Sequence, residues 1–424
     1  MRAYIESYGC WLNKGETEVM RQLLAREGYT IVESPSEADV IVVNTCAVRG
    51  DTERNMLKRI AELYALSRKK GSKLVVAGCL VNVRPALIAR IAPTASLLEP
   101  DALERITEAV KDRVVIVREY KPHRSMLPIH SGGHTYVIPV QTGCLGSCRF
   151  CVGKVARMRL FSYPMDAVVK HVRDAVRRGA KQVFLVGQDL AAYGRDRGTT
   201  LSELLRALLE EVDGDYRIRV GMMEPHTVST IAKPLVQLMK DPRVCNYLHL
   251  PLQSGDDRIL RLMNRKYTVK EYKSLVAAFR ERLDRLNLVT DVIVGYPGEG
   301  EKEFLNTVNA VKEIVFDKVH VARYTLRPFT AAYVMEQQVP EPEKKRRSSL
   351  MSKVAAEVGL LANRRYVGLT AEALVEGAGT RGYILRLRSN YKPVVVHDPV
   401  KIGEIVEVRI VGCSPFHLVG KVIR

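Results

Sequence analysis

The chain has 424 residues, 46% of them hydrophobic, which is enough for two or three domains with buried cores. Its 66 Lys and Arg residues exceed its 47 Asp and Glu residues by 19, which favours a polyanionic partner such as a nucleic acid, although a charge-rich surface suited to high temperature explains the same excess. The sequence has no run of about eighteen apolar residues and no signal-peptide pattern at its start, so we expect a cytoplasmic protein with no membrane partner.

The first 125 residues alternate between strand and helix patterns. We predict strands at residues 3–8, 39–44 and 73–77, and helices at residues 15–27 and 51–66. Asn13 and Glu16 have the spacing of a capping box at the start of the first helix. Strands separated by helices predict a small parallel sheet with helices on its faces.

One cysteine follows each of these three strands. Cys10 comes after the first strand, Cys46 after the second and Cys79 after the third. Because the carboxyl ends of parallel strands meet at one edge of a sheet, we expect the three thiols to converge. Three converged thiolates suit an iron–sulfur cluster with one open iron, although a cysteine is also a common small buried side chain.

Three more cysteines lie close together in residues 140–151, directly after a predicted strand. Cys144, Cys148 and Cys151 are separated by three and then by two residues. A structural zinc site normally closes all four positions with paired C-x-x-C units, and bacterial ferredoxin loops have tighter spacing and a fourth cysteine. The pattern C-x-x-x-C-x-x-C therefore favours a cluster whose fourth iron binds another molecule, as in a radical S-adenosylmethionine (SAM) site.

From residue 126 to about residue 340 the chain repeats the strand-then-helix pattern. The predicted strands are residues 136–140, 182–186, 217–221, 247–252, 288–294 and 318–322, with helices between them, for example at residues 165–178, 201–211 and 269–285. Six such units are too few to close an eight-stranded barrel. We expect an open, three-quarter barrel with a lateral gap wide enough for a bulky substrate.

Polar residues follow several of these strands, where barrels of this kind carry their functional groups. His249 lies on an apolar strand and is equally well explained as a hydrogen-bonded core residue. Phe150, between two thiols of the cysteine loop, has a ring that suits stacking on an adenine. The predicted cofactor contacts are Phe150, Gln188, Glu224, Gln253 and Arg265.

The last part of the chain predicts a charged connector, a helix and a small barrel. Residues 341–349 form the connector, whose basic part at 344–347 is expected to be solvated, and residues 350–366 form the helix. Short strands are predicted at residues 370–376, 383–388, 393–397, 405–411 and 418–423. Five short strands of this kind are typical of a Greek-key barrel of the OB type.

One strand of this small barrel carries alternating basic residues. Arg386 and Arg388 alternate with leucines, so both guanidiniums point to one face, and Tyr391 and Lys392 lie near them. Basic and aromatic side chains on one face predict an RNA-binding surface. An ordinary half-exposed strand explains the pattern nearly as well.

The cysteine motifs resemble those of the radical SAM methylthiotransferase family. They read Tyr8-Gly9-Cys10, Asn44-Thr45-Cys46-Ala47-Val48-Arg49, Ala77-Gly78-Cys79 and the Cys144, Cys148, Cys151 triad. The resemblance covers essentially the whole chain. It implies an N-terminal methylthiotransferase domain (residues 1–125), a radical SAM domain (residues 126–365) and a C-terminal TRAM domain (residues 366–424).

The resemblance implies two 4Fe-4S clusters, one on Cys144, Cys148 and Cys151, with SAM on its open iron, and one on Cys10, Cys46 and Cys79. It also implies the reaction, in which reductive cleavage of SAM yields a 5′-deoxyadenosyl radical that abstracts the hydrogen at C2 of an adenine. A sulfur from the second cluster, methylated by another SAM, then attaches there.

Within the family, residues 143–145, 161–164, 192–196, 250–255 and 391–394 most resemble the archaeal and eukaryotic branch that acts on N6-threonylcarbamoyladenosine next to the anticodon of tRNA. The chain departs from its relatives at Ala156-Arg157-Met158-Arg159, where they carry an Arg-Gly pair, so the roles of the two arginines stay open. The implied partners are tRNA, an electron donor and a sulfur donor, and no DNA is expected. Isopentenyladenosine in tRNA, a ribosomal-protein aspartate, and a non-catalytic iron–sulfur tRNA-binding protein are the alternatives.

Overall fold

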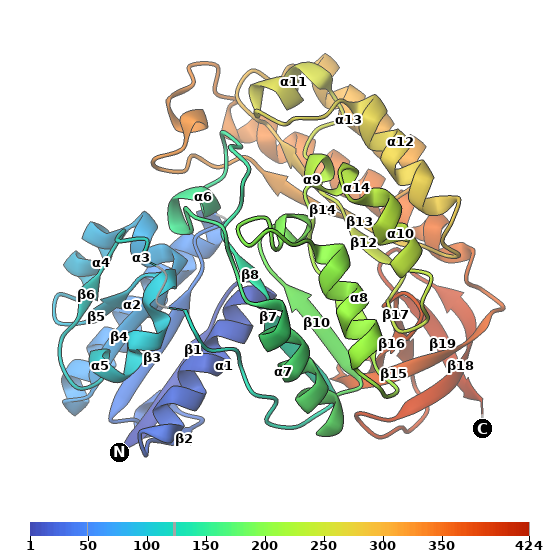
Figure 1. Ribbon diagram of the computed structural model, residues 1–424. Coiled ribbons are helices and arrows are strands. Elements are labelled where there is room, and N and C mark those ends of the chain that lie inside the picture. The colour runs from blue at the N-terminus through green and yellow to red at the C-terminus, as the bar shows by residue number, and fades with distance from the viewer. Residues whose placement is uncertain (49, 122–123, 424) are drawn as a thin grey trace.

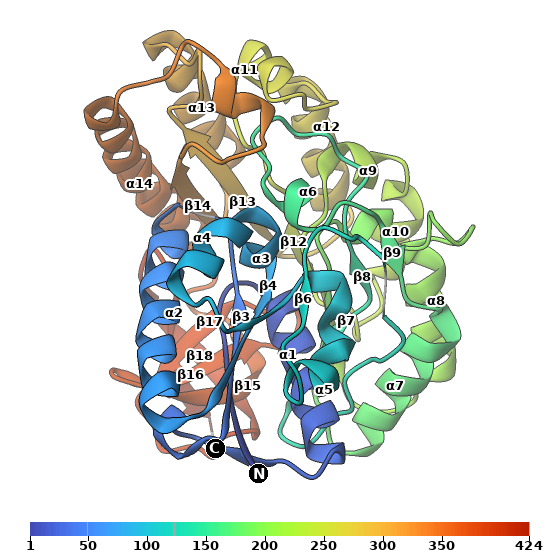
Figure 2. The same ribbon diagram turned by 90° about the vertical axis from the view of Figure 1, so that its left-hand side faces the viewer.

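The computed structural model describes residues 1–48, 50–121 and 124–423, which form three sheet units in chain order (Figure 1). The expected fold class is confirmed: a parallel α/β sheet is followed by an open barrel of parallel strands and by a small closed barrel. Figure 2 shows the N-terminal unit in front of the C-terminal barrel. Arg49, the last residue of one quoted cysteine motif, lies outside the described residues.

The N-terminal unit is a parallel sheet in the order β2-β1-β3-β4-β5-β6. Its strands are β1 (Arg2–Ser7), β2 (Thr30–Val32), β3 (Val40–Thr45), β4 (Lys73–Gly78), β5 (Ser96–Leu98) and β6 (Val115–Ile116). Its helices are α1 (Trp11–Arg26), η1 (Pro35–Glu37), α2 (Gly50–Lys70), α3 (Cys79–Val83), α4 (Pro85–Ile91), η2 (Pro100–Arg105) and α5 (Ile106–Ala109). The three predicted strands are confirmed as β1, β3 and β4.

Strand β3 is apolar throughout because both of its faces are buried. Ile41 and Val43 pack in the core beneath α2, whereas Val40 and Val42 pack on the opposite face in the core beneath α1. Strands β2, β5 and β6 were not predicted, since two or three residues are too few to show a period of two.

The predicted capping box at the start of α1 is wrong. The helix begins at Trp11 with Cys10 at the N-cap, and no side chain caps it. Asn13 lies inside the first turn and donates hydrogen bonds to the carbonyl oxygens of Tyr8 and Thr45, at 2.9 and 3.0 Å. Glu16 is buried and pairs with arginines from other parts of the chain, because tertiary contacts take these polar groups away from the helix terminus.

Six parallel strands form the open barrel in the order β7-β10-β11-β12-β13-β14, with isolated bridges joining β11 to β12. They are β7 (Thr135–Pro139), β10 (Gln182–Val186), β11 (Arg217–Val220), β12 (Tyr247–His249), β13 (Asn287–Val294) and β14 (Lys318–Arg323). Among the described residues no pairing joins β7 to β14. The barrel is therefore open on that side, as predicted.

Helices cover the outside of the barrel, where a continuous apolar core separates them from the strands (Figure 1). They are α7 (Met165–Arg177), α8 (Leu201–Glu211), α9 (Pro225–Ser229), α10 (Ala232–Leu238), α11 (Asp257–Leu262), α12 (Val269–Arg280) and α13 (Glu301–Ile314). The connecting loops contain β8 (Gln141–Thr142), α6 (Gly153–Ala156), β9 (Phe161–Ser162), η3 (Leu190–Ala192) and η4 (Ala331–Val334).

The predicted connector at residues 341–349 is the first half of a long helix, α14 (Glu341–Arg364). Its basic residues were expected to be solvated, and this is wrong for two of them. Lys344 and Arg347 are buried, and the Arg347 guanidinium donates to the Glu299 carboxylate at 2.7 Å. A charge run that packs on a neighbouring loop cannot be told from a solvated one without the tertiary structure.

The last unit is a closed five-stranded barrel in the order β15-β16-β17-β19-β18, as predicted. The strands are β15 (Thr370–Gly379), β16 (Gly382–Leu387), β17 (Pro393–Val396), β18 (Ile405–Cys413) and β19 (Leu418–Ile423). Within the part of the chain that the structure describes, no helix combines the length and the apolar character that a membrane span requires.

Candidate active site

Cys10, Cys46 and Cys79 converge at one edge of the N-terminal sheet. They follow β1, β3 and β4, which are neighbours in that sheet. A Cβ atom built on Gly9 would lie 2.9 Å from the Cys46 Sγ. Burial, with smaller contributions from the nearby Cys46 and Cys10, raises the pKa of the Cys79 thiol to about 12. The predicted convergence of these thiols is therefore what the structure shows.

Glycine before two of these cysteines allows the tight turns that bring them together. Gly9 has a φ of +104° and Gly78 a φ of +92°, in the region that L side chains avoid. A Cβ atom on Gly78 would also lie only 2.2 Å from the Asn44 side-chain oxygen. A larger residue at either position would displace the neighbouring thiol loops.

The second set, Cys144, Cys148 and Cys151, lies in the loop between β8 and α6. The Gly146 amide donates to the Cys144 Sγ at 3.2 Å, and the Arg265 guanidinium donates to the Cys148 Sγ at 3.0 Å. Burial, with smaller contributions from nearby acidic groups and thiols, raises the pKa of Cys144 to about 12. The Cys144 thiol would therefore ionise when a metal binds and displaces its proton.

Three of the five predicted cofactor contacts surround this loop. Arg265 joins the Cys148 thiol to the Glu224 carboxylate, with a nitrogen–oxygen distance of 3.0 Å to the latter. A Cβ atom on Gly153 would lie 3.1 Å from the Gln188 amide nitrogen and 3.3 Å from the Cys151 Sγ, so that amide is adjacent to the loop.

Of the other two predicted contacts, Phe150 lies within the cysteine loop itself, and Gln253 lies in the loop after β12. Phe150 packs against Tyr296, with ring centroids 6.3 Å apart. Gln253 has a φ of +66°, and its backbone pairs with β13.

Buried polar atoms without partners show that these residues fit a polar cofactor such as SAM. Among the described residues, the side-chain oxygens Gln188 Oε1, Asp189 Oδ2 and Gln253 Oε1 are buried and accept no hydrogen bond. Asp189 was not among the predicted contacts, although its loop was noted. Burial and the Glu224 charge raise the pKa of Asp189 to about 6, although the Glu224 backbone amide opposes this by donating to it.

Arg157 connects the two cysteine sets. Only 2% of it is exposed, and its Nε donates to the Cys79 Sγ at 3.4 Å. Its Nη2 donates to Glu16 Oε2 at 2.6 Å and to Asn13 Oδ1 at 3.2 Å. A side chain six positions after Cys151 therefore reaches a thiol of the other set.

The buried pair of Arg157 and Glu16 should stabilise this domain contact. Burial alone would raise the pKa of the Glu16 carboxyl, but the Arg157 and Arg124 guanidiniums hold it below its ordinary value. We expect Arg157→Gln to lower the free energy of unfolding by about 3 kcal/mol, because it leaves a buried carboxylate short of a partner. Chemical denaturation at pH 7 measures this change.

Acidic pH should reduce the difference in the free energy of unfolding between Arg157→Gln and the wild-type protein. A lowered carboxyl pKa contributes stability that is complete above the ordinary pKa and is lost as pH falls through the lowered one. The matched control is Arg159→Gln, since Arg159 is exposed. Equal stability of the two variants would contradict a structural role for Arg157.

The predicted RNA-binding residues do not form an exposed face, and that expectation is wrong. The Lys392 Nζ donates to the Asp317 carboxylate at 2.6 Å, and Arg388 pairs with Asp215 at 2.5 Å. These contacts join the small barrel to the large one. Three of the predicted residues are buried and the fourth is partly buried; the four are Arg386, Arg388, Tyr391 and Lys392.

Tyr391 in particular closes the floor of the large barrel. Its ring packs edge-on against Phe184 and Tyr247, with centroid distances of 5.2 and 5.9 Å. The alternation in β16 therefore reflects a domain interface, which sequence cannot distinguish from a ligand-binding face.

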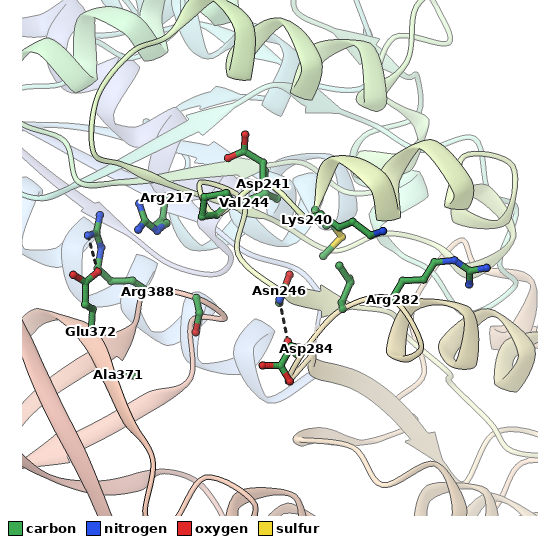
Figure 3. A pocket seen from close by; sticks show the side chains of 14 residues that line it. Arg217, Lys240, Asp241, Val244, Asn246, Arg282, Asp284, Ala371, Glu372 and Arg388 are labelled. Carbon is green, nitrogen blue, oxygen red and sulfur yellow. Dashed lines mark hydrogen bonds and ion pairs between the residues drawn. The ribbon is translucent and has the colours of Figure 1, made fainter.

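A cavity of about 400 Å³ lies beside this interface (Figure 3). Arg217, Asn246 and Arg282 line it, and Arg388 pairs with Glu372 at its edge. These residues lie at or before the amino ends of β11, β12 and β13, at the opposite end of the barrel from the cysteine loops. The cavity is therefore not where the cysteines act.

Comparison with known proteins agrees with this architecture. Residues 2–98 match the uncharacterized protein family UPF0004, residues 138–311 the radical SAM superfamily and residues 364–423 the TRAM domain. The fold resembles that of the radical SAM methyltransferase TsrM from Kitasatospora setae, with a TM-score of 0.58 over 78% of this chain and 77% of the other at 14% identity.

Two curated relatives align over the full length of this chain. The probable threonylcarbamoyladenosine tRNA methylthiotransferase of Pyrococcus horikoshii is 37% identical over all of both chains. The tRNA-2-methylthio-N(6)-dimethylallyladenosine synthase of Thermotoga petrophila is 31% identical over all of this chain and 97% of the other.

An open parallel barrel with a three-cysteine loop at its mouth defines a radical SAM protein, a class that binds an iron–sulfur cluster and SAM. The chain belongs to the radical SAM tRNA methylthiotransferase family.

Proposed function

We propose that this enzyme inserts a methylthio group at C2 of N6-threonylcarbamoyladenosine next to the anticodon of tRNA. The observation that supports the proposal is that the chain carries two separate three-thiol sets, and that Arg157, six positions after Cys151, contacts the Cys79 thiol of the other set. The Pyrococcus horikoshii relative, named for the same modified base, is more similar than the relative named for dimethylallyladenosine.

The residues divide into two cofactor sites. Cys144, Cys148 and Cys151 would hold one 4Fe-4S cluster, with SAM bound by the nearby polar residues and Phe150. Cys10, Cys46 and Cys79 would hold a second cluster. The chemistry that these groups supply when bound is one-electron cleavage of SAM at the first site and delivery of sulfur at the second.

Three thiols per site leave room for a further ligand, which a fourth cysteine would block. Arg265 contacts both the Cys148 thiol and the Glu224 carboxylate. In the same way, Arg157 contacts both the Cys79 thiol and the Glu16 carboxylate. The enzyme also needs an electron donor and a sulfur donor, and we place it in the cytoplasm with its tRNA substrate.

Nucleoside mass spectrometry of tRNA tests the proposal directly. Cells that lack the protein should lose 2-methylthio-N6-threonylcarbamoyladenosine and accumulate the precursor without the methylthio group. Loss of the dimethylallyl product instead would favour the alternative substrate. A purified, anaerobically reconstituted protein that releases no 5′-deoxyadenosine from SAM would favour a non-catalytic tRNA-binding protein.

Exposed basic residues of the small barrel are the better candidates for contacting tRNA phosphates. Arg409 and Lys421 are exposed and lie opposite each other on β18 and β19. We expect the double variant Arg409→Gln, Lys421→Gln to weaken tRNA binding and to reduce the slope of log K against log salt by about 2.

A titration of tRNA affinity against salt measures this effect. The matched control replaces two exposed basic residues of α2, Arg68→Gln with Lys69→Gln, which removes the same net charge elsewhere. An equal loss of affinity in both double variants would mean that overall charge, rather than this surface, attracts the tRNA.

A further inference from the structure

A polar cluster lies on three adjacent strands of the large barrel. His249 on β12, Asp291 on β13 and His320 on β14 have ligand-type atoms that all lie within 4.8 Å of one another. The His249 Nε2 and the Asp291 Oδ2 are 2.7 Å apart, and the two imidazole rings are 5.8 Å apart. Asp291 and His320 are direct partners in the parallel pairing of β13 with β14, so they share one face.

That face is the inside of the barrel. On β13, Leu288, Val292 and Val294 belong to the core beneath the outer helices, so the alternate residues point inward. Val289 packs with the aromatic floor, and Ile293 packs near Phe150 at the cofactor end. Asp291 therefore lies midway between the floor and the predicted SAM site.

Solvent reaches this level of the barrel. The side chains of His249 and Asp291 keep 16% and 27% of their surface accessible, although they lie on strands inside the fold. The aromatic floor closes the space below them. A group entering from the cysteine end would therefore meet the cluster before it meets the floor.

The surrounding charges decide what the cluster accepts. Two histidines and one carboxylate are also the donor set of a divalent-metal site. However, Lys318 lies two residues before His320 on β14, on the same face of the strand. Desolvation and the Arg386 and Arg219 guanidiniums lower the pKa of Lys318, whereas Asp291 raises it. A divalent cation would be repelled by these charges, whereas an anion would be attracted.

Arg219 adds a positive charge at the floor of the barrel, on the side of the cluster away from the cysteine loops. Only 8% of it is exposed, and it points inward from β11, where its Nη2 donates to the Tyr247 hydroxyl at 2.9 Å. Its Nε is buried and has no hydrogen-bond partner among the described residues. Its guanidinium also lies over the rings of Phe184, Tyr247 and Tyr391, with distances of 5.0, 4.4 and 4.8 Å to the ring centroids, so the aromatic floor holds this charge in place.

We propose that His249, Asp291, His320 and Lys318 bind the N6 side chain of the substrate base and require that it carry a carboxylate. Lys318 and the imidazole N–H of His320 face the carboxylate, and Asp291 accepts a hydrogen bond from a hydroxyl or amide N–H of the same side chain. This inference rests on the proposed function. An apolar dimethylallyl group would displace water from these polar groups and offer them no hydrogen bond in return, which is a basis for rejection.

Binding of synthetic anticodon stem-loops to the full-length protein tests the inference without requiring loaded clusters. Three loops differ only at the N6 substituent: threonylcarbamoyl, its methyl ester, and dimethylallyl. For the wild-type protein, esterification should weaken binding about tenfold, because it removes one charge-assisted interaction. For Lys318→Met the ester and the acid should bind almost equally, since the partner of the charge is gone.

His320→Leu should likewise reduce the preference for the acid, and Lys312→Met, an exposed residue of α13, is the matched control that should keep it. An ester effect that is unchanged in both Lys318→Met and His320→Leu would overturn the inference. A stoichiometric divalent metal bound to the wild-type protein without iron–sulfur reconstitution, and lost in His320→Leu, would also overturn it. If wild-type enzyme modifies only the dimethylallyl loop, the proposed function itself fails and the inference falls with it.

Discussion

Cys148→Ala will release no 5′-deoxyadenosine from SAM above the level of protein without iron. Cys148 is one of only three thiols in its loop, and its partner Arg265 is nine-tenths buried. The substitution removes a ligand and leaves this guanidinium with fewer acceptors. Two thiols are too few to hold a cubane cluster, so reductive cleavage of SAM has no site. Anaerobic reconstitution followed by chromatography of the nucleoside product measures the result.

The matched control for this variant is Cys413→Ala, which removes a cysteine from the small barrel, far along the chain from either set. It should reconstitute and cleave SAM as the wild-type protein does. Release of 5′-deoxyadenosine by Cys148→Ala at the control's rate would show that this loop does not hold the cluster.

Cys46→Ala should separate the two sites, keeping SAM cleavage while losing methylthio transfer. Cys46 lies in the N-terminal domain, next to Gly9 and close enough to Cys79 to raise its pKa. None of the contacts of the Cys144 loop described above involves it. We expect about half of the bound iron to be lost, because one of two four-iron sites is removed. Iron analysis, 5′-deoxyadenosine release and tRNA nucleoside analysis are measured on the same preparation.

Cys245→Ala is the control for Cys46→Ala, since both thiols are buried and Cys245 packs in the floor of the large barrel. It should keep full iron content and product formation. If Cys46→Ala still forms the methylthiolated nucleoside at the wild-type rate, the assignment of a second cluster to the N-terminal domain is wrong.

Most of the longer elements were predictable from the sequence, and several of the shortest ones were not. Residues 182–186 and 201–211 were predicted with the observed bounds of β10 and α8, because the first is a short apolar run typical of a buried strand and the second shows the helical period. Strands β5 and β6 have three and two residues and were missed. Arg388 and Lys392 were predicted to face RNA but lie in the domain interface, since an alternating pattern shows which residues share a face and not what covers it.

The chemistry proposed for this protein follows from local features of its sequence. The spacing of Cys144, Cys148 and Cys151, and a cysteine after each of three strands, depend only on local order and on the common direction of parallel strands. The contacts between distant parts of the chain became visible in the folded structure. It brings Arg157 to Cys79 and places His249, Asp291 and His320 on one inner face of the barrel. Such contacts join residues far apart in the chain, and their distances follow from packing, which leaves no local pattern in the sequence.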